Sequence, residues 1–517
     1  MKISAVPQPK EITPREGYLC AAPTFATCDE SFSAPLQAIS EVFDRIFALA
    51  LTPSDAEAPD ESLFTPLTEA QNKRPEGNNE GKPSHVAKPG EERSGMGFFI
   101  KRDEALAPGE YRIEVGSACR VTASCAEGLC RAFSVIAQIS ERTCDKYVKV
   151  PKCVIHDRPD SPFRGLLIDV ARRWHPADYL FRYVDVCSML GVNRLILHFT
   201  DDESYTLPCR AFPLLPTECR HYTEEEMRAL DSYAASRGVT IIPEIDMPGH
   251  SAQFSLKYPE IFGRCGIMEA TDKVFGALGA IYKEASELFP HSPFIHAGGD
   301  EAVLGRWDDS DATKEYMADH GIPDFVALYG HFVGKVCKTI LSLGRTPIVW
   351  EGFGKGANDL VPKETLVISW ENHYQTACEL SDAGFTLLNA SWRPLYVVSP
   401  WQKWSPREIL SWDKYSFDHW WETSKAYGRG ITLPRDASVE GGMLCAWGDY
   451  LKNYESSRLA CQLEFASVVP RLSAAAEKLW NDDSCYEEDE EGYESAARRL
   501  DTLFDLLRGE CAFRGKL

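Results

Sequence analysis

The chain has 517 residues, of which 44% are hydrophobic and 26% are charged. This composition supports a large buried core and excludes a chain that is disordered throughout. The net charge of −22 has the wrong sign for a protein that grips nucleic-acid phosphates. No apolar run approaches the roughly 20 residues that a membrane helix needs, so an integral membrane protein is excluded as well.

Residues 1–150 are expected to form a small α+β domain. Residues 34–50 carry apolar side chains at helical spacing. Residues 109–125 alternate like strands and are followed by a short amphipathic helix. Residues 51–93 are rich in Pro, Glu, Asn, Gly and Lys, which predicts a mobile surface insertion inside this domain.

The 17 cysteines are scattered and form no C-x-x-C pair, which indicates buried free thiols. The N-terminal residues contain no apolar segment of signal-peptide length. Together these features predict a reducing, cytoplasmic setting, although a secreted protein that has lost its leader would look the same.

From Arg164 onward, apolar strands alternate with helices, and the near-continuous hydrophobicity of the strands predicts a parallel sheet buried on both faces. Eight such strands indicate an α/β chain with a (β/α)8 TIM barrel at residues 151–517, ending in a C-terminal helix. A doubly wound sheet is the alternative, but no G-x-G-x-x-G follows any strand. The strands are expected near 164–171, 194–200, 240–246, 294–298, 346–351, 365–370, 385–390 and 442–447.

Catalytic groups of such barrels lie where each strand ends, and polar and aromatic residues recur at those positions. A single carboxylate there is often a helix N-cap, and a single tryptophan often only packs. The whole set favours a sugar site, with acids for the glycosidic bond and aromatic faces for the pyranose ring. Its members are Asp169, His198, Asp201, Asp202, Glu244, Asp246, His250, His296, Asp300, Glu301, Trp350, Glu351, Trp370, Glu371, Trp392, Arg393, Tyr396, Trp447 and Asp449.

The segment HAGGDE at 296–301 is the most specific element. Repulsion and burial should raise the pKa of one of its adjacent carboxyls, so that one stays protonated as a general acid and the other stays charged. Adjacent carboxyls cannot face each other across the sugar at the roughly 5 Å used by retaining enzymes with a protein nucleophile. The nucleophile is therefore expected to come from elsewhere, such as a neighbouring group of the substrate.

Four segments resemble β-N-acetylhexosaminidases of glycoside hydrolase family 20: residues 164–174, 197–205, 242–251 and 296–301. The resemblance covers about 164–480. It implies an exo-acting, retaining enzyme that removes terminal β-linked GlcNAc or GalNAc through an oxazolinium intermediate, without a metal or cofactor. It also implies that Glu301 is the general acid and base and that Asp300 orients the acetamido group.

The same resemblance assigns the residues that bind the substrate. Trp350, Trp370 and Trp447 would wall the acetamido pocket, and Tyr396 would donate a hydrogen bond to the acetamido oxygen. The remaining roles fall to Arg164, which would hold the sugar hydroxyls, to His250, which would support the acid through Asp246, and to Asp449, which would accept hydrogen bonds from the sugar.

Two positions depart from the family pattern. Val398 stands where the family often has an acidic residue, and Asp449 stands where it often has a glutamate. These differences leave open the preferred epimer at carbon four and the way in which the oxygen at carbon six is held. The tryptophan-rich segment 399–425 is expected to form a long loop over the rim.

Three alternatives remain open from the sequence. One is a metal-dependent hydrolase on the same barrel. Another is a carbohydrate-binding protein without catalysis. The third is a family member that releases a disaccharide or a 6-modified hexosamine. The candidate metal ligands are His198, Asp246, His250, His296 and Asp300.

Overall fold

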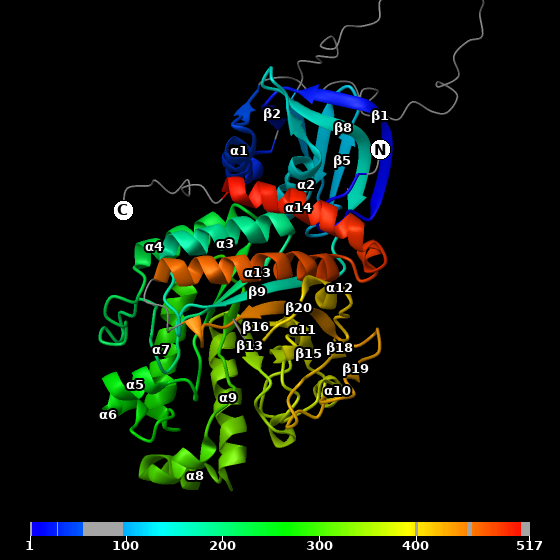
Figure 1. The fold of residues 1–517 in the computed structure, drawn as a ribbon. Helices are drawn as coiled ribbons and strands as arrows, with labels where there is room; N and C mark the ends of the chain where they lie inside the picture. The colour runs from blue at the N-terminus through cyan, green and yellow to red at the C-terminus, as the bar shows by residue number, and fades with distance from the viewer. Residues whose placement is uncertain (1–2, 28, 55–96, 399–401, 452–456, 508–517) are drawn as a thin grey trace, which may run out of the picture.

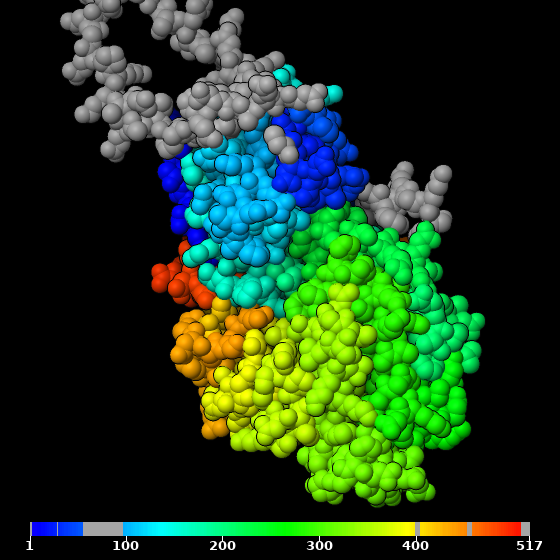
Figure 2. All heavy atoms as spheres, turned by 180° about the vertical axis from the view of Figure 1, so that it is seen from behind, coloured from blue at the N-terminus to red at the C-terminus, as the bar shows by residue number. Residues whose placement is uncertain are grey.

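The computed structural model describes residues 3–27, 29–54, 97–398, 402–451 and 457–507. A small α+β domain lies at one end of a barrel (Figure 1). In the view from behind, the N-terminal domain, in blue and cyan, lies above the barrel (Figure 2). Within these described residues, no helix is long and apolar enough to cross a membrane, and the fifteen cysteines are free thiols.

An eight-stranded sheet with two helices forms the N-terminal domain, as predicted. Strand order is β1-β8-β5-β6-β4-β2-β3, with β7 paired to β8, and α2 packs on β5 and β6. The strands are β1 (Glu11–Ala21), β2 (Thr24–Thr27), β3 (Thr52–Pro53), β4 (Phe98–Arg102), β5 (Tyr111–Val115), β6 (Cys119–Ala123), β7 (Glu141–Arg142) and β8 (Val148–Asp157). The helices are α1 (Ser33–Phe47) and α2 (Ala126–Ile139).

Two boundaries of this domain differ from the prediction. Strand β8 carries the first sheet to Asp157, past the expected boundary at residue 150, because it pairs with both β1 and β5. Residues 52–53, at the start of the predicted insertion, form β3 and pair with β2. Residues 55–93 of that insertion lie outside the described residues.

Eight parallel strands close into the predicted barrel. Strand β20 pairs with β15 on one side and with β9 on the other, which leaves no free edge and rules out the doubly wound alternative. The eight strands are β9 (Phe163–Asp169), β10 (Arg194–His198), β11 (Thr240–Glu244), β12 (Phe294–His296), β13 (Thr346–Trp350), β14 (Leu366–Ser369), β15 (Thr386–Asn389) and β20 (Val439–Ala446).

Helices surround the barrel, and their ends follow local sequence signals. Helix α3 (Ala177–Leu190) stops at Gly191, whose φ is +68°, and α4 (Glu224–Ala235) begins with a capping box formed by Thr223 and Glu226. The other α-helices of the described residues are α5 (Ala252–Lys257), α6 (Pro259–Phe262), α7 (Asp272–Leu288), α8 (Asp311–His320), α9 (Phe325–Ser342), α10 (Ala377–Asp382), α11 (Trp392–Leu395), α12 (Pro406–Leu410), α13 (Ser457–Trp480) and α14 (Glu490–Leu507).

The tryptophan-rich segment contains short regular elements. Strand β16 (Tyr396–Val398) pairs with β17 (Gln402–Lys403) and with β20, and β18 (Ser416–Phe417) pairs with β19 (Ile431–Thr432). Helix α12 packs against α13. The end of the segment lies at the rim, as predicted, because the Ser424 hydroxyl donates to the carbonyl oxygen of Glu371 after β14.

The two domains share a buried interface. Helix α2 contacts α3, and α14 packs against α1 and α2 as well as α3 (Figure 1). At the end of α13, the indole N–H of Trp480 donates to Asp157 at 2.9 Å, and the Tyr111 hydroxyl donates to the same carboxylate at 2.8 Å. The C-terminal helix thus covers the N-terminal domain rather than only closing the barrel.

Candidate active site

Asp300 and Glu301 follow β12 after a tight turn at Gly298 and Gly299. A Cβ on Gly298, whose φ is +65°, would lie 1.8 Å from an oxygen of Asp246. That oxygen accepts a hydrogen bond from the backbone N–H of Gly299 at 2.8 Å. Only a glycine fits this approach, and the tight turn places both acids at the carboxyl end of the barrel.

Asp300 is buried beside Asp246. Oδ1 of Asp300 and Oδ2 of Asp246 are buried without a hydrogen-bond partner in the described structure, and groups of the two side chains approach within 4.8 Å. Burial, with repulsion from Glu301 and Glu244, raises the pKa of Asp300 to about 6. Burial, with repulsion from Asp300, raises the pKa of Asp246 well above its ordinary value. Both carboxyls are therefore protonated more easily than an exposed carboxyl.

Glu301 stands in a different environment, with 58% of its side chain exposed. Its Oε2 lies 3.4 Å from Nε2 of His250, and the hydrogen bond from His250 lowers its pKa. The expected contrast between the two acids exists, but its direction is opposite to the assignment of Glu301 as the protonated group. The reason is that Asp300 is the buried member, whereas Glu301 faces a cationic partner.

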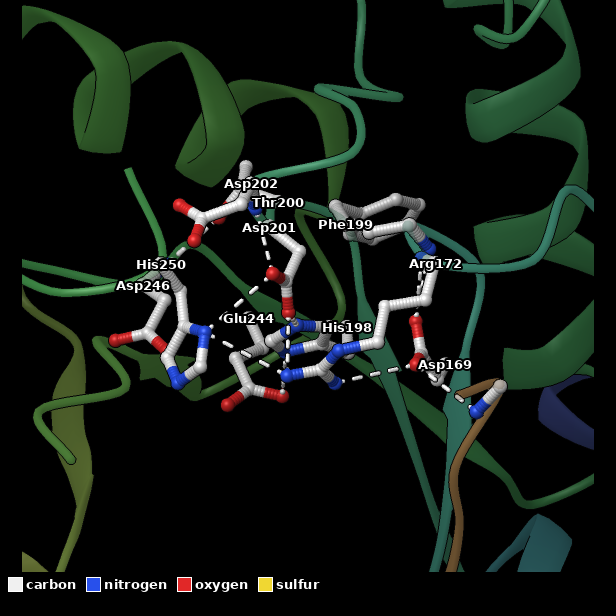
Figure 3. A network of polar contacts seen from close by, with 12 residues as sticks. Asp169, Arg172, His198, Phe199, Thr200, Asp201, Asp202, Glu244, Asp246 and His250 are labelled. Atoms are coloured by element: carbon white, nitrogen blue, oxygen red, sulfur yellow. Dashed lines mark hydrogen bonds and ion pairs between the residues drawn. The ribbon is translucent and has the colours of Figure 1, made fainter. Parts of the chain in front are cut away.

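His250 pairs with Asp201 rather than with Asp246 (Figure 3). Its Nδ1 lies 3.3 Å from Oδ1 of Asp201, whereas Oδ1 of Asp246 accepts the backbone N–H groups of Met247 and Gly299. The predicted support for Glu301 is therefore corrected to a Glu301–His250–Asp201 series. The carboxylates of Asp201 and Glu301 raise the pKa of His250 against its burial, so the ring carries a positive charge.

Arg172 is a site residue that the sequence analysis did not select. Its Nη2 lies 2.7 Å from Asp201 and its Nη1 lies 3.2 Å from Asp169 (Figure 3). Its Nε is 3.7 Å from Asp449, and its guanidinium lies 5.1 Å from the centre of the Trp447 ring. The signal was available, because Arg172 follows the carboxyl end of the first barrel strand, where catalytic groups gather.

Arg164 lies at the other end of the same strand, so its predicted role in binding the sugar is wrong. The side chain is 1% exposed and donates to the carbonyl oxygens of Ser161 at 2.5 Å and Gly191 at 2.7 Å. It also pairs with Glu127 of α2 and therefore joins the barrel to the N-terminal domain.

The four aromatic residues assigned to the acetamido pocket meet above the barrel interior, with Trp392 beside them. Trp350 lies 6.1 Å from Trp370 and 5.9 Å from Trp447, measured between ring centres. Tyr396 lies 6.1 Å from both Trp370 and Trp447, and Trp392 stacks on it at 4.5 Å. Burial raises the pKa of the Tyr396 phenol, so this hydroxyl stays a hydrogen-bond donor.

Val398 and Asp449, the two positions that depart from the family pattern, lie close to this aromatic cluster. Val398 is buried within it. The carboxylate of Asp449 is 46% exposed and faces Arg172.

Residues 161–483 match glycosyl hydrolase family 20, catalytic domain. The chain belongs to glycosyl hydrolase family 20. It is similar to the β-hexosaminidase of Vibrio furnissii, with 30% identity over 329 residues, 56% of this chain and 53% of that protein. It is also similar to subunit beta of human β-hexosaminidase, with 26% identity over 374 residues, 68% of this chain and 63% of that one. The chain thus spans little more than half of the Vibrio relative's length.

Solved structures of family 20 share the fold. One is the exo β-N-acetylglucosaminidase of Vibrio harveyi in complex with N-acetylglucosamine, with a TM-score of 0.75 and 20% identity over 96% of this chain and 77% of that one. Another is the β-N-acetylhexosaminidase of Bacteroides fragilis, with a TM-score of 0.73 and 18% identity over 97% and 96% of the two chains. At these identities the likeness establishes the fold alone.

Two of the candidate metal ligands in this family 20 site, His198 and His250, contact carboxylates through both ring nitrogens. Three groups of acids and histidines are close enough to hold an ion. However, His198 lies 3.0 Å from both Asp201 and Glu244 through its two ring nitrogens, and His250 contacts Asp201 and Glu301 in the same way. Their carboxylate partners raise both histidine pKa values, and a protonated imidazole has no lone pair for a metal.

Proposed function

We propose that the protein is an exo-acting, retaining β-N-acetylhexosaminidase that removes terminal β-linked GlcNAc or GalNAc through an oxazolinium intermediate. The observation that carries this proposal is the placement of two adjacent acids beside the cluster of Trp350, Trp370, Trp447 and Tyr396. Adjacent residues on one turn cannot occupy opposite faces of the sugar. An aromatic pocket beside them suits an acetamido group, whose carbonyl oxygen can serve as the nucleophile.

In the first step, the acetamido oxygen bonds to the anomeric carbon while the bond from that carbon to the leaving oxygen breaks. Glu301 gives its proton to the leaving oxygen. Asp300, as a carboxylate, stabilises the positive charge on the acetamido nitrogen. Because the nucleophile belongs to the substrate, its high effective concentration lowers the barrier.

In the second step, water attacks the anomeric carbon and Glu301 removes its proton. The bond from the acetamido oxygen to the anomeric carbon breaks, which restores the acetamido group. Two inversions at the anomeric carbon give net retention of configuration.

The low pKa of Glu301 in the free protein fits this role through His250. The two side chains lie 3.4 Å apart and hold one proton between them. A sugar bound over the pair excludes water, which disfavours the separated charges. Binding therefore transfers the proton from His250 to Glu301 and produces the acid when the substrate is present.

Arg172 and Asp449 supply the polar end of the site. Asp169 and Asp201 orient the guanidinium of Arg172, which leaves its remaining N–H groups for the hydroxyls of the terminal sugar. Asp449 accepts a hydrogen bond from a hydroxyl of the same sugar, and Tyr396 donates a hydrogen bond to the acetamido oxygen. These assignments rest on where the side chains lie at the rim.

The test is hydrolysis of 4-nitrophenyl glycosides of β-GlcNAc, β-GalNAc and β-glucose, each with and without a chelator. We expect hydrolysis of the two acetamido sugars, no hydrolysis of the glucoside, and no effect of the chelator. Equal rates on the glucoside would remove the acetamido group from the mechanism, and loss of activity with chelator would favour the metal-dependent alternative.

A further inference from the structure

Glu244 is a fully buried carboxylate that contacts the site from below. It is the last residue of β11 and is 0% exposed, so it cannot touch a bound sugar. Its Oε1 accepts a hydrogen bond from Nε1 of Trp350 at 2.7 Å, and its Oε2 lies 3.0 Å from Nδ1 of His198. Oε1 also lies 3.3 Å from Nδ1 of His296. One side of the carboxylate therefore contacts an indole and a histidine, and the other side contacts a second histidine.

Through His198, Glu244 connects to the catalytic acid. Contacts of 3.4 Å or less join Glu301 to Trp350 without a gap, and Figure 3 shows the middle of this series. The contacts are Glu301–His250 at 3.4 Å, His250–Asp201 at 3.3 Å, Asp201–His198 at 3.0 Å, His198–Glu244 at 3.0 Å and Glu244–Trp350 at 2.7 Å.

The charges along this series support ionised Glu244. Burial alone would raise its pKa, but His296, His198 and the Trp350 N–H outweigh burial and lower the pKa to about 2. Burial would also discharge His198, yet Glu244 and Asp201 raise the pKa of that ring well above its ordinary value. A carboxylate and an imidazolium therefore lie beneath the site as a neutral pair.

The indole of Trp350 is fixed by this hydrogen bond. The side chain is 1% exposed, and its ring packs against Trp370 and Trp447. Packing alone allows an aromatic ring to slide, whereas a charged acceptor at Nε1 fixes its position in the plane. The pocket proposed for the N-acyl group has this ring as part of its wall.

We propose that Glu244 is a positioning residue that fixes Trp350 and so determines which N-acyl groups the pocket accepts. This inference rests on the proposed function, because it assigns the aromatic pocket to the acyl group. Glu244 also keeps His198 charged beneath Asp201, which connects the pocket wall to the residues that support Glu301.

The first test compares Glu244→Gln with the wild type on 4-nitrophenyl glycosides that carry N-acetyl or N-butanoyl groups. We expect kcat for the N-acetyl substrate to fall about tenfold with a smaller change in KM, because a charged hydrogen bond is lost. We also expect the preference for acetyl over butanoyl to narrow by a similar factor. An unchanged preference would overturn the proposal.

Glu351→Gln is the matched control. Glu351 follows Trp350 and is also buried, but its carboxyl accepts the backbone N–H groups of Tyr374 and Gln375. Burial raises its pKa to about 8, so a neutral amide is a close substitute at neutral pH. We expect Glu351→Gln to keep the wild-type preference for acetyl over butanoyl. If Glu351→Gln narrows that preference as much as Glu244→Gln does, the effect is not specific to Glu244 and the proposal fails.

A double variant distinguishes action through Trp350 from general damage. If Glu244 acts by holding the indole, Glu244→Gln combined with Trp350→Phe should narrow the preference no more than Trp350→Phe alone. If the double variant instead narrows the acetyl-over-butanoyl preference by the product of the two single effects, the result would contradict the proposal.

A spectroscopic measurement tests the same contact without activity. In protein labelled with ¹⁵N-tryptophan, the indole N–H signal of Trp350, assigned through Trp350→Phe, should move in Glu244→Gln and stay in place in Glu351→Gln. A signal that does not move in Glu244→Gln overturns the inference even if the protein hydrolyses no acetamido sugar, an outcome that would separately contradict the proposed function.

Discussion

Nε2 of His250 lies 3.4 Å from Oε2 of Glu301, and both residues hold a backbone φ of +45°. A left-handed backbone costs a residue other than glycine about 1 to 2 kcal/mol. The two residues come from the loops after neighbouring strands, β11 and β12. The fold thus accepts strain at two positions that together place one proton beside the proposed leaving group.

The pH dependence of kcat/KM follows from this pair and from Asp300. The productive form has an ionised Asp300 and one proton held between His250 and Glu301. Below the pKa of Asp300, about 6, Asp300 is protonated and cannot stabilise the charge on the acetamido nitrogen. Above that pKa Asp300 is ionised, whereas His250, whose pKa is raised by Asp201 and Glu301, still holds its proton. We expect kcat/KM to rise as pH rises through about 6 and to level off toward neutral pH. A rate of the free enzyme that falls as pH rises through 6 would contradict this assignment.

Glu301→Gln removes the acid and should affect substrates according to their leaving groups. An aliphatic sugar hydroxyl needs a proton to leave, whereas nitrophenolate does not. We expect kcat/KM for a GlcNAc disaccharide to fall by about 10²- to 10⁴-fold and that for the 4-nitrophenyl glycoside to fall less. Equal losses on both substrates would argue that Glu301 does not protonate the leaving oxygen.

Arg172→Lys tests the arginine at the carboxyl end of β9. Lysine keeps the charge but loses the fork that Asp169 and Asp201 orient. We expect kcat/KM to fall by about 100-fold, because small errors in substrate position are costly. Thermal unfolding of the same variant serves as the control, and a wild-type rate would exclude Arg172 from sugar binding.

Arg164→Met tests the correction at the amino end of the same strand. Loss of the guanidinium leaves the partly exposed carboxylate of Glu127 without its cationic partner, and an acceptor left in this way costs about 1 to 3 kcal/mol. We expect a lower free energy of unfolding by denaturant, whereas KM for the 4-nitrophenyl glycoside stays close to that of the wild type. A stable variant with a raised KM would restore the original assignment of Arg164.

The barrel could be predicted from the sequence because parallel strands that are buried on both faces are continuous apolar runs. All eight expected strands overlap the observed ones, and β20 closes the barrel between β15 and β9. The sequence also predicted that the four pocket aromatics come together, since strand ends converge at one rim. The ends of the elements were less predictable, because β8 is extended by its pairing with β1 and β5.

Side-chain partners were harder to predict than the fold. Arg164 and Arg172 belong to one motif, and only the direction of the strand separates a domain contact from a site residue. Asp201 and Asp246 both follow strands beside His250, so the choice of Asp201 depends on side-chain positions that spacing does not encode. The pKa directions of Asp300 and Glu301 could not be predicted for the same reason. They depend on which of the two adjacent side chains is buried, and the spacing of residues in the sequence does not show this.

The most direct test of the central claim varies the nucleophile itself. Rates would be measured for 4-nitrophenyl glycosides whose N-acetyl group carries none, one, two or three fluorines, since each fluorine withdraws electrons from the carbonyl oxygen while changing its size little. The account predicts that kcat/KM falls steeply with each added fluorine. A rate that does not depend on fluorine content would show that the acetamido oxygen is not the nucleophile.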